Sequence, residues 1–321
     1  MKAFLRTLAG LALFAAAQAA AQGYPNRVVK IIVPSPPGQA VDVVARLVGE
    51  SLSLSLGQPF IVDNRPGAGG VIGINALMSA AADGYTTVVG SSGPLSINPH
   101  LQKVPFDPQK SLAPVSLLAT LQYVLVTHPS FPAASAKELI ALVRANPGTY
   151  NFAGSGAGTT QHLAGEWFKL GAGLDAVFIP YAGSTAALSD VMGGRISYAF
   201  ETSAAALPLV QAGRLKALGV SSLKRASQLP DVPTIAESTE LTDFNVVAWI
   251  GLLVRAGTPA EVPAKLAGEV QKALQARDVR ERFMALGMDL ASSTPAELAR
   301  LMHGASERFG DVIKRANVKL E

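Results

Sequence analysis

Two loops rich in proline, glycine and hydroxyl residues constrain this chain most. Residues 34–42 follow a short apolar run and lead into a helical pattern, and residues 153–162 do the same later in the chain. A strand that ends in such a loop and turns into a helix leaves the first N–H groups of that helix without partners. Those donors, with the positive end of the helix dipole, suit a carboxylate or phosphate. Neither loop contains Lys or Arg, so backbone and hydroxyl groups would hold the anion.

Short apolar runs alternate with helical patterns over most of the length. The alternation predicts an α/β fold with mixed, mostly parallel sheets flanked by helices. Strands are predicted at 28–33, 60–62, 86–90, 123–127, 150–153, 176–179, 196–200 and 215–220, and helices at 41–56, 69–81, 136–145, 160–170, 185–192 and 204–212. From about Pro259 onward the chain is predicted to be nearly all helix.

Residues 1–21 predict a secretory signal peptide. Lys2 and Arg6 precede the apolar residues 8–17, and Ala19 and Ala21 form an A-x-A cleavage site. An N-terminal membrane anchor is the alternative, but the apolar segment is too short to span a bilayer. We expect cleavage after Ala21 and a soluble product outside the cytoplasm.

Composition excludes several classes of protein. The chain has no cysteine, so it has no disulfide, thiolate metal site or thiol nucleophile. Hydrophobic residues make up 49% of it, which is enough for a stable core without disulfides. Without Lys2 and Arg6, 25 basic residues stand against 23 acidic ones, and the two signs are interspersed, as in residues 277–282. That distribution is typical of solvated helix faces and argues against nucleic-acid binding.

Common catalytic and cofactor motifs are absent or broken. Residues 90–93 and 154–156 are not nucleophile elbows, and no Gly-Lys-Ser/Thr sequence is present. The histidines His100, His128, His162 and His303 lack metal-ligand spacing. A histidine in the first turn of a helix, as predicted for His162, is more often a local hydrogen-bond partner than a catalytic base. We predict no metal and no cofactor, while a triad that is not sequential stays open.

Two further features allow two interpretations each. The glycine-rich residues 64–70 could form a ligand loop or a tight turn that needs positive φ. Glu201 follows the predicted strand 196–200, at a carboxyl end where ligands collect in open α/β sheets. The ordinary alternative is a solvated carboxylate. If Glu201 faces a ligand, its charge favours a ligand with an amine, amide or hydroxyl at its distal end.

The short motifs occur in an order that resembles one family. They are VPSPPG (33–38) with Asp42, LGQP (56–59), NRPGAGG (64–70), DGYT (83–86), SGAG (155–158), HLAGE (162–166), PYAG (180–183), LPDVPT (229–234), Trp249 with 251–252, and AGTP (256–259). In this order they resemble the Bug receptors, the extracytoplasmic solute-binding proteins of tripartite tricarboxylate transporters.

The resemblance implies a two-lobed, Venus-flytrap periplasmic binding protein. Domain I would comprise residues 22–124 and 246–321, and domain II residues 125–245. It further implies a monomeric periplasmic receptor, not an enzyme, that binds a small carboxylated metabolite and delivers it to membrane permease subunits or to a sensor.

The resemblance also implies that a ligand carboxylate lies between the two loops. The implied ligand-binding residues are Ser35, Pro36, Pro37, Gly38, Gln39, Ala40, Asp42, Gly70, Ser91, Ser155, Gly156, Ala157, Gly158, Thr159, Thr160, His162, Tyr181, Glu201 and Thr202. The family commonly has an aromatic residue where Ser35 stands, a second glycine where Gln39 stands and often Asp where Glu201 stands. These departures concern the identity of the ligand more than the carboxylate site.

Two function classes follow. The first is a receptor for a carboxylate-containing metabolite. The alternative is a secreted α/β hydrolase with a non-sequential catalytic triad, for which the sequence lacks a nucleophile elbow.

Overall fold

The computed structural model describes residues 23–285 and 287–320. The predicted signal peptide, 1–21, lies outside the described residues. The strands are β1 (Val29–Val33), β2 (Phe60–Asn64), β3 (Thr86–Ser91), β4 (Leu112–Thr127), β5 (Tyr150–Gly154), β6 (Ala176–Pro180), β7 (Tyr198–Thr202), β8 (Lys216–Val220), β9 (Val247–Arg255) and β10 (Asp289–Leu290). The α-helices are α2 (Ala40–Leu56), α3 (Val71–Met78), α4 (Asn98–Leu101), α5 (Ala136–Ala145), α6 (Thr160–Ala172), α7 (Ser184–Met192), α8 (Ser203–Gln211), α9 (Ile235–Ser238), α10 (Glu261–Gln275), α11 (Arg277–Ala285) and α12 (Pro295–Arg315), with short turns η1 (Ala68–Gly70) and η2 (Gly93–Ile97).

The α/β prediction is confirmed, and the sheet is mixed. The main strand order is β2-β1-β3-β9-β4-β7-β5-β6. The outer strands pair in parallel, β1 with β2 and β3, and β5 with β6 and β7. The two central strands are antiparallel to their neighbours: β9 to β3, and β4 to β9, β7 and β8. The prediction of mostly parallel strands therefore holds for the outer strands and not for the centre.

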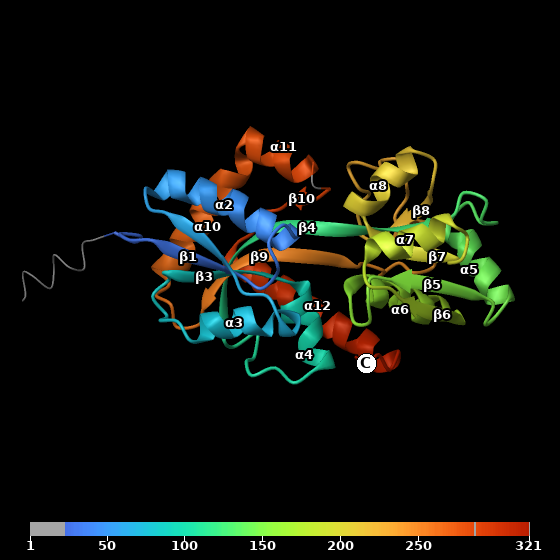
Figure 1. Ribbon diagram of the computed structural model, residues 1–321, viewed down its shortest axis with the longest axis horizontal. Coiled ribbons are helices and arrows are strands. Elements are labelled where there is room, and N and C mark those ends of the chain that lie inside the picture. Colours follow the sequence, from blue (N-terminus) through green and yellow to red (C-terminus); the bar gives the residue numbers. More distant parts are fainter. Residues whose placement is uncertain (1–22, 286, 321) are drawn as a thin grey trace, which may run out of the picture.

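The strand directions bring four carboxyl ends toward the middle of the molecule. Because β9 is antiparallel to both β3 and β4, strands β1 and β3 run in the same direction as β4. Strands β5 and β7 run against β4. The elements form two groups, and the long strands β4 and β9 run from one group to the other (Figure 1). The ends of β1 and β3 thus point toward the ends of β5 and β7.

Alternation along β1 shows how the first group is layered. Val29, Ile31 and Val33 are packed with α2 and α10 in one buried cluster, whereas Ile32 is in the cluster that contains α3 and α12 residues. Successive side chains of a strand point to opposite faces, so this sheet is covered by helices on both sides. Both faces of β1 are therefore covered, which matches its apolar sequence, in which the exposed Lys30 is the one polar residue.

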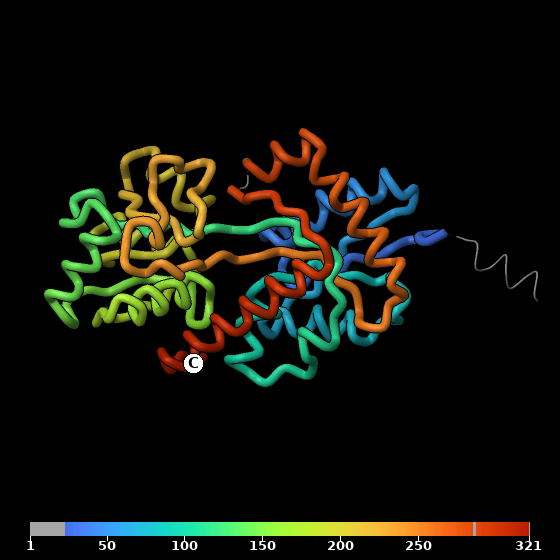
Figure 2. Tube along the Cα trace, turned by 180° about the vertical axis from the view of Figure 1, so that it is seen from behind, coloured from blue at the N-terminus to red at the C-terminus, as the bar shows by residue number. Residues whose placement is uncertain are grey.

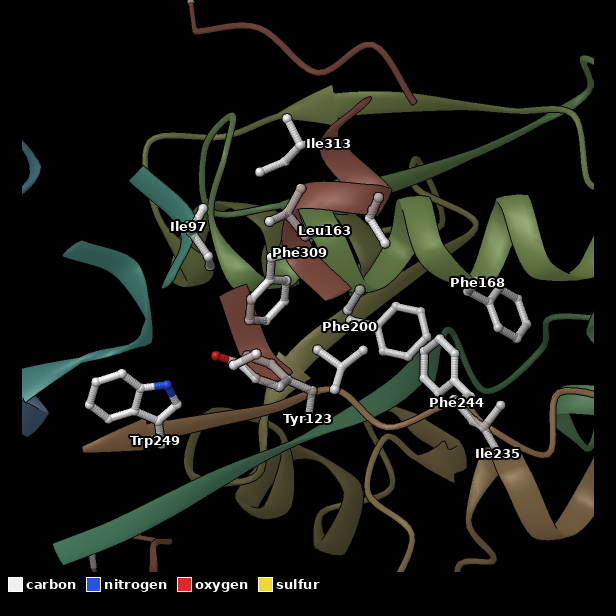
Figure 3. Packing of buried hydrophobic residues seen from close by; sticks show 14 of the residues in the cluster. Ile97, Tyr123, Leu163, Phe168, Phe200, Ile235, Phe244, Trp249, Phe309 and Ile313 are labelled. Carbon is white, nitrogen blue, oxygen red and sulfur yellow. The ribbon is translucent and has the colours of Figure 1, made fainter. Parts of the chain in front are cut away.

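The last helix connects the two groups of elements. Thr294 starts α12 with a reciprocal capping box to Glu297. The helix runs from the first group toward the second and ends close to it (Figure 2). Phe309 and Ile313 of α12 lie in one buried cluster with Leu163 of α6, and Figure 3 shows these side chains close together. The C-terminal segment is thus packed against the middle segment of the chain as well as against β4.

Candidate functional site

The ends of β3 and β7 approach each other along the central strands. Ser91, the last residue of β3, is opposite Ile250, which is opposite Ala119 of β4. Thr202, the last residue of β7, is opposite Tyr123 of β4. Along β4, Ala119 and Tyr123 are four positions apart, which is about 13 Å at roughly 3.3 Å per residue. The first loop follows β1, the neighbour of β3, and the second loop follows β5, the neighbour of β7. The two loops therefore lie on either side of this interval.

Asp42 holds the first loop together from inside α2. Its carboxylate accepts hydrogen bonds from the Gly38 N–H (2.8 Å) and the Asn64 amide (2.8 Å), and it pairs with Arg46 at 3.0 Å. Asn64 also donates to the carbonyl of Ser35 at 3.1 Å. Burial raises the pKa of Asp42, but the Arg46, Gly38 and Asn64 hydrogen bonds outweigh it and the net shift is downward. Both carboxylate oxygens are used by the protein, so Asp42 supports the loop.

The rest of the first loop combines one buried residue with an exposed tip. Ser35 is buried, and its hydroxyl has no hydrogen-bond partner among the described residues. Residues 36–39 are exposed, and Ala40 is half-buried at the start of α2. Gln39 occupies the N-cap of α2 without a side-chain capping hydrogen bond. The first turn of α2 therefore receives no acceptor from its own N-cap side chain.

The glycine-rich residues 64–70 form a tight turn beside the first loop. Gly67, Gly69 and Gly70 all have positive φ, at 121°, 62° and 95°. A Cβ atom at Gly70 would lie 2.8 Å from Cβ of Pro94 and 3.3 Å from Cβ of Pro34. Only glycine lets this turn pack so closely against the start of the first loop, which favours the turn interpretation.

The second loop is built in the same way. The Gly158 N–H donates to Nδ1 of His162 at 3.1 Å. Thr159 is the N-cap of α6: its hydroxyl accepts from the His162 N–H at 3.4 Å and donates to the Gly156 carbonyl at 2.8 Å. Ser155, Gly156 and Ala157 are half-buried. His162 is thus a local hydrogen-bond partner, as its position in the first turn predicts.

His162 is enclosed by aromatic and charged groups. It is 6% exposed, and its ring stacks on Phe178 with centroids 3.6 Å apart. Its Nε2 lies 3.7 Å from Oε1 of Glu166, which pairs with Lys169 at 2.7 Å. Both ring nitrogens therefore face protein groups. The imidazole is therefore placed to hold the loop.

Three other predicted site residues contact protein partners. The Tyr181 hydroxyl donates to Asp190 at 2.5 Å, and the Tyr181 N–H donates to the Gly154 carbonyl at 3.0 Å. Thr202 caps α8 by accepting from the Ala205 N–H at 3.4 Å. Thr160 is buried at the start of α6, where its hydroxyl opposes the effect of burial, which raises the pKa of the Tyr123 phenol.

Glu201 is the least expected of the predicted residues. It is 0% exposed, and neither carboxylate oxygen has a hydrogen bond of ordinary geometry among the described residues. Burial raises its pKa, and the Ser184 hydroxyl, the Thr202 N–H and the Gln161 amide act in the opposite direction. Glu201 is therefore a shielded carboxyl beneath the first turns of α6 and α7, and not the solvated strand-end carboxylate of the alternative interpretation.

The sequence analysis does not identify several residues that connect the strand ends with the starts of the helices. Tyr123 lies opposite Thr202, and burial raises the pKa of its phenol to about 12. The Gln161 amide donates to the Ser184 hydroxyl at 3.4 Å, which links the starts of α6 and α7. The backbone N–H of Trp249 donates to the Ser92 hydroxyl at 2.8 Å, next to the end of β3. Gln161 and Ser184 were detectable, since both begin helices that follow predicted loops.

The profile of the tripartite tricarboxylate transporter family receptors, TctC, matches residues 44–318. The chain belongs to this receptor family. BugT of Bordetella pertussis is 37% identical over 308 residues, which cover 95% of this chain and 94% of BugT. A protein from the tcbD-tcbE intergenic region of a Pseudomonas species is 38% identical over 312 residues, or 96% of this chain and 93% of that protein.

Solved structures of similar proteins share this architecture. MatC from Rhodopseudomonas palustris, solved with bound malate, is 31% identical with a TM-score of 0.72, covering 90% of this receptor and 100% of that chain. Another R. palustris protein, solved with adipate, is 30% identical with a TM-score of 0.76, covering 93% and 100%. A TctC solute-binding protein from Polaromonas without ligand is 25% identical with a TM-score of 0.83, covering 91% and 100%.

Family membership decides between the two function classes. Its members are periplasmic substrate-binding receptors, so the receptor is not an enzyme and the hydrolase alternative is wrong. In residues 23–285 and 287–320, no three His, Asp or Glu side chains are grouped as metal ligands. Of the helices in the same part of the chain, none combines the length and hydropathy of a membrane span.

Proposed function

We propose that this receptor binds a small carboxylate-containing metabolite between the two loops and delivers it to a tripartite transporter permease or to a sensor. The observation that carries the proposal is the convergence of the ends of β1 and β3 with the ends of β5 and β7. Each loop leads into a helix whose N-terminus is the positive end of its dipole. Two such loops, beside strand ends that lie about 13 Å apart along β4, suit a small anion with bridging water.

The affinity can reach the micromolar range without a cationic clamp. Neither loop contains Lys or Arg, so backbone N–H and hydroxyl groups supply the hydrogen bonds. About four charge-assisted hydrogen bonds at roughly 1.5–3 kcal/mol each are available in gross terms. After ordering and desolvation costs, a net binding free energy of about −8 kcal/mol corresponds to a micromolar dissociation constant.

We propose that the receptor closes over its ligand by a hinge in β4 and β9. Residues 22–124 and 246–321 form domain I, and residues 125–245 form domain II. The pairing of β4 supports this boundary: Gln122 still pairs with β9, whereas Tyr123 pairs with β7 and Val124 with β7 and β8. Val246 in turn bonds to Ser221, next to β8, before β9 begins.

We expect export to produce a mature N-terminus at Gln22. The basic residues, the apolar residues 8–17 and the A-x-A pattern support cleavage after Ala21. The mature protein then acts as a monomer in the periplasm. Intact-mass measurement of the periplasmic fraction tests this prediction. A retained Met1, or recovery in the membrane fraction alone, contradicts it.

A thermal-shift screen tests the carboxylate proposal directly. The panel contains mono- and dicarboxylates, aromatic acids and amino acids, applied to protein freed of carried-over ligand. A cognate ligand at 100 times its dissociation constant stabilises the fold by about 2.7 kcal/mol. Each acid is paired with its uncharged amide as the matched control. Stabilisation by the amides alone, or by no acid at all, rejects a carboxylate site.

We expect Gly156→Val to weaken carboxylate binding about tenfold. Gly156 has φ of +125°, which a β-branched residue rarely adopts, so the second loop must change its backbone. Gly194→Val is the matched control, because Gly194 also has positive φ, at 70°, and lies at the end of α7. Calorimetry with the ligand found in the screen measures both. Wild-type affinity in a folded Gly156→Val protein places the carboxylate elsewhere.

A further inference from the structure

The two loops are one structural unit that occurs twice. Gly38 and Gly158 have φ of 82° and 72°. The following residues, Gln39 and Thr159, are N-caps with φ of −76° in both and ψ of 161° and 162°. In each case the glycine N–H donates to the side chain four residues later, which belongs to the first turn of the helix. An acceptor at this position fixes the loop relative to its helix.

The acceptors differ in their chemistry. Asp42 accepts in the first loop, and Arg46 and Asn64 hold its carboxylate in place. His162 accepts in the second loop through a ring nitrogen. A carboxylate whose pKa is lowered stays an acceptor through neutral and mildly acidic pH. An imidazole accepts only when it is neutral, because both nitrogens of the imidazolium are donors.

The surroundings of His162 fix which nitrogen accepts. Nδ1 faces the Gly158 N–H, so the proton of the neutral ring belongs on Nε2, which faces Glu166 at 3.7 Å. Two other titratable groups lie around Glu166. Lys169 pairs with it, and Tyr198 has a pKa that is raised by burial and by the charge of Glu166. Strands β5 and β6 contribute the rings of Phe152 and Phe178. Addition of a proton to Nδ1 would direct two donors, Gly158 N–H and Nδ1–H, at each other.

We propose that His162 is a positioning residue that makes the second loop acid-sensitive, while the loop held by Asp42 keeps its geometry. Only the effect of His162 on ligand binding rests on the proposed function. Protonation of His162 releases Gly158, the second loop loosens and a bound carboxylate dissociates more readily. The receptor then loses affinity in mildly acidic solution through one of its two loops.

Nitrogen-15 NMR of the ligand-free receptor tests the positioning role without any ligand. Histidine and glycine labels are followed in the wild type, His162→Asn and His162→Leu. Asparagine keeps an acceptor near the Nδ1 position, and leucine removes it. Between about pH 7.5 and about pH 5.5, we expect the Gly158 amide signal to shift with the His162 ring in the wild type, but not in His162→Asn. The Gly38 amide is the internal control and should not move.

Two results overturn the positioning role. One is an unprotonated Nε2 at neutral pH, which means that Nδ1 carries the proton. The other is a Gly158 amide that is the same in the wild type and in His162→Leu at both pH values. A folded His162→Leu protein with a displaced Gly158 signal, rescued by His162→Asn, supports the role.

The same proteins are then titrated with malate and with adipate as probes. We expect the wild type to lose about tenfold in affinity between the two pH values, and His162→Asn to lose less than about threefold. An equal loss in both proteins overturns the acid-sensitive loop. If neither probe nor any acid of the screen binds, the proposed function fails, while the amide signals still decide the role of His162.

Discussion

We expect the Asp42→Ala variant to lose about 2–4 kcal/mol of unfolding free energy. Asp42 is 2% exposed and is bonded to the Gly38 N–H, the Asn64 amide and Arg46. Alanine removes every one of these contacts at once. Hydrogen bonds to a charged group contribute about 1.5–3 kcal/mol each and are not additive. Urea unfolding measures the loss, and calorimetry should show carboxylate affinity reduced roughly thirtyfold because the first loop is released.

The difference between the wild type and Asp42→Ala should depend on pH with a known sign. The pKa of Asp42 is lowered in the fold, because hydrogen bonds from Arg46, Gly38 and Asn64 outweigh the opposing effect of burial. A carboxylate whose pKa is lower in the folded state stabilises the fold at pH values above its unfolded pKa, about 3.9. This stability is lost as the pH falls through the pKa of the folded state. The two stability curves should run parallel above about pH 5 and converge below about pH 4.

Asp63→Ala is the matched control for this prediction. Asp63 also pairs with an arginine, Arg65, at 3.0 Å and lies at the end of β2, but its side chain is 26% exposed and it bonds to no loop N–H. A pair of this kind contributes about 1 kcal/mol or less. Equal losses for the two variants would show that Asp42 has no special role in the loop.

The local structure of the loops was predictable because single residues determine it. Glycine, proline and capping residues act on the backbone within a few positions, and so the starts of α2 and α6 fall within one residue of the predicted ones. The spacing Gly-x-x-x-acceptor is also visible in the sequence, at Gly38 with Asp42 and at Gly158 with His162. The sequence alone does not mark it as a repeated device, and the family resemblance implies ligand contact for both acceptors.

The central strands were not predictable in the same way. The sequence patterns predict only residues 123–127 of β4 and no strand at β9. Pro114 interrupts the first half of β4, and residues 112–122 are stabilised by pairing with β9, more than 100 positions away. Long-range pairing of this kind leaves little local signal. The burial of Glu201 depends on another long-range pairing, because Glu201 of β7 lies opposite Val124 of β4.

Replacing Glu201 by glutamine should stabilise the receptor at neutral pH by about 1–3 kcal/mol. Burial raises the pKa of Glu201 above its ordinary 4.5. A raised folded pKa means that the fold favours the protonated carboxyl, so ionisation costs stability above the unfolded pKa and the cost grows until the folded pKa is reached. Glutamine resembles the protonated form. The variant should therefore match the wild type below about pH 4 and exceed it at neutral pH.

Glu166→Gln is the control with the opposite sign. Glu166 is also buried, but Lys169 pairs with it. Burial raises the pKa of Glu166, whereas His162 and Lys169 lower it by more, so the net shift is downward. Its charge is therefore stabilising above its unfolded pKa, and glutamine should lower the stability at neutral pH. A loss of stability in both variants would show that Glu201 has an ionic partner in solution.

The Glu201→Gln substitution should also reorder the ligands. An ionised Glu201 beneath the starts of α6 and α7 opposes a second carboxylate and favours an amine, amide or hydroxyl at the distal end of the ligand. Glutamine removes that charge, so dicarboxylates should gain roughly tenfold relative to ligands with a distal amine. Calorimetry with glutarate, its monoamide glutaramate and 4-aminobutyrate compares anionic, neutral and cationic distal groups on chains of similar length. An unchanged order of affinities in the two proteins would separate Glu201 from ligand choice and leave it a purely structural carboxyl.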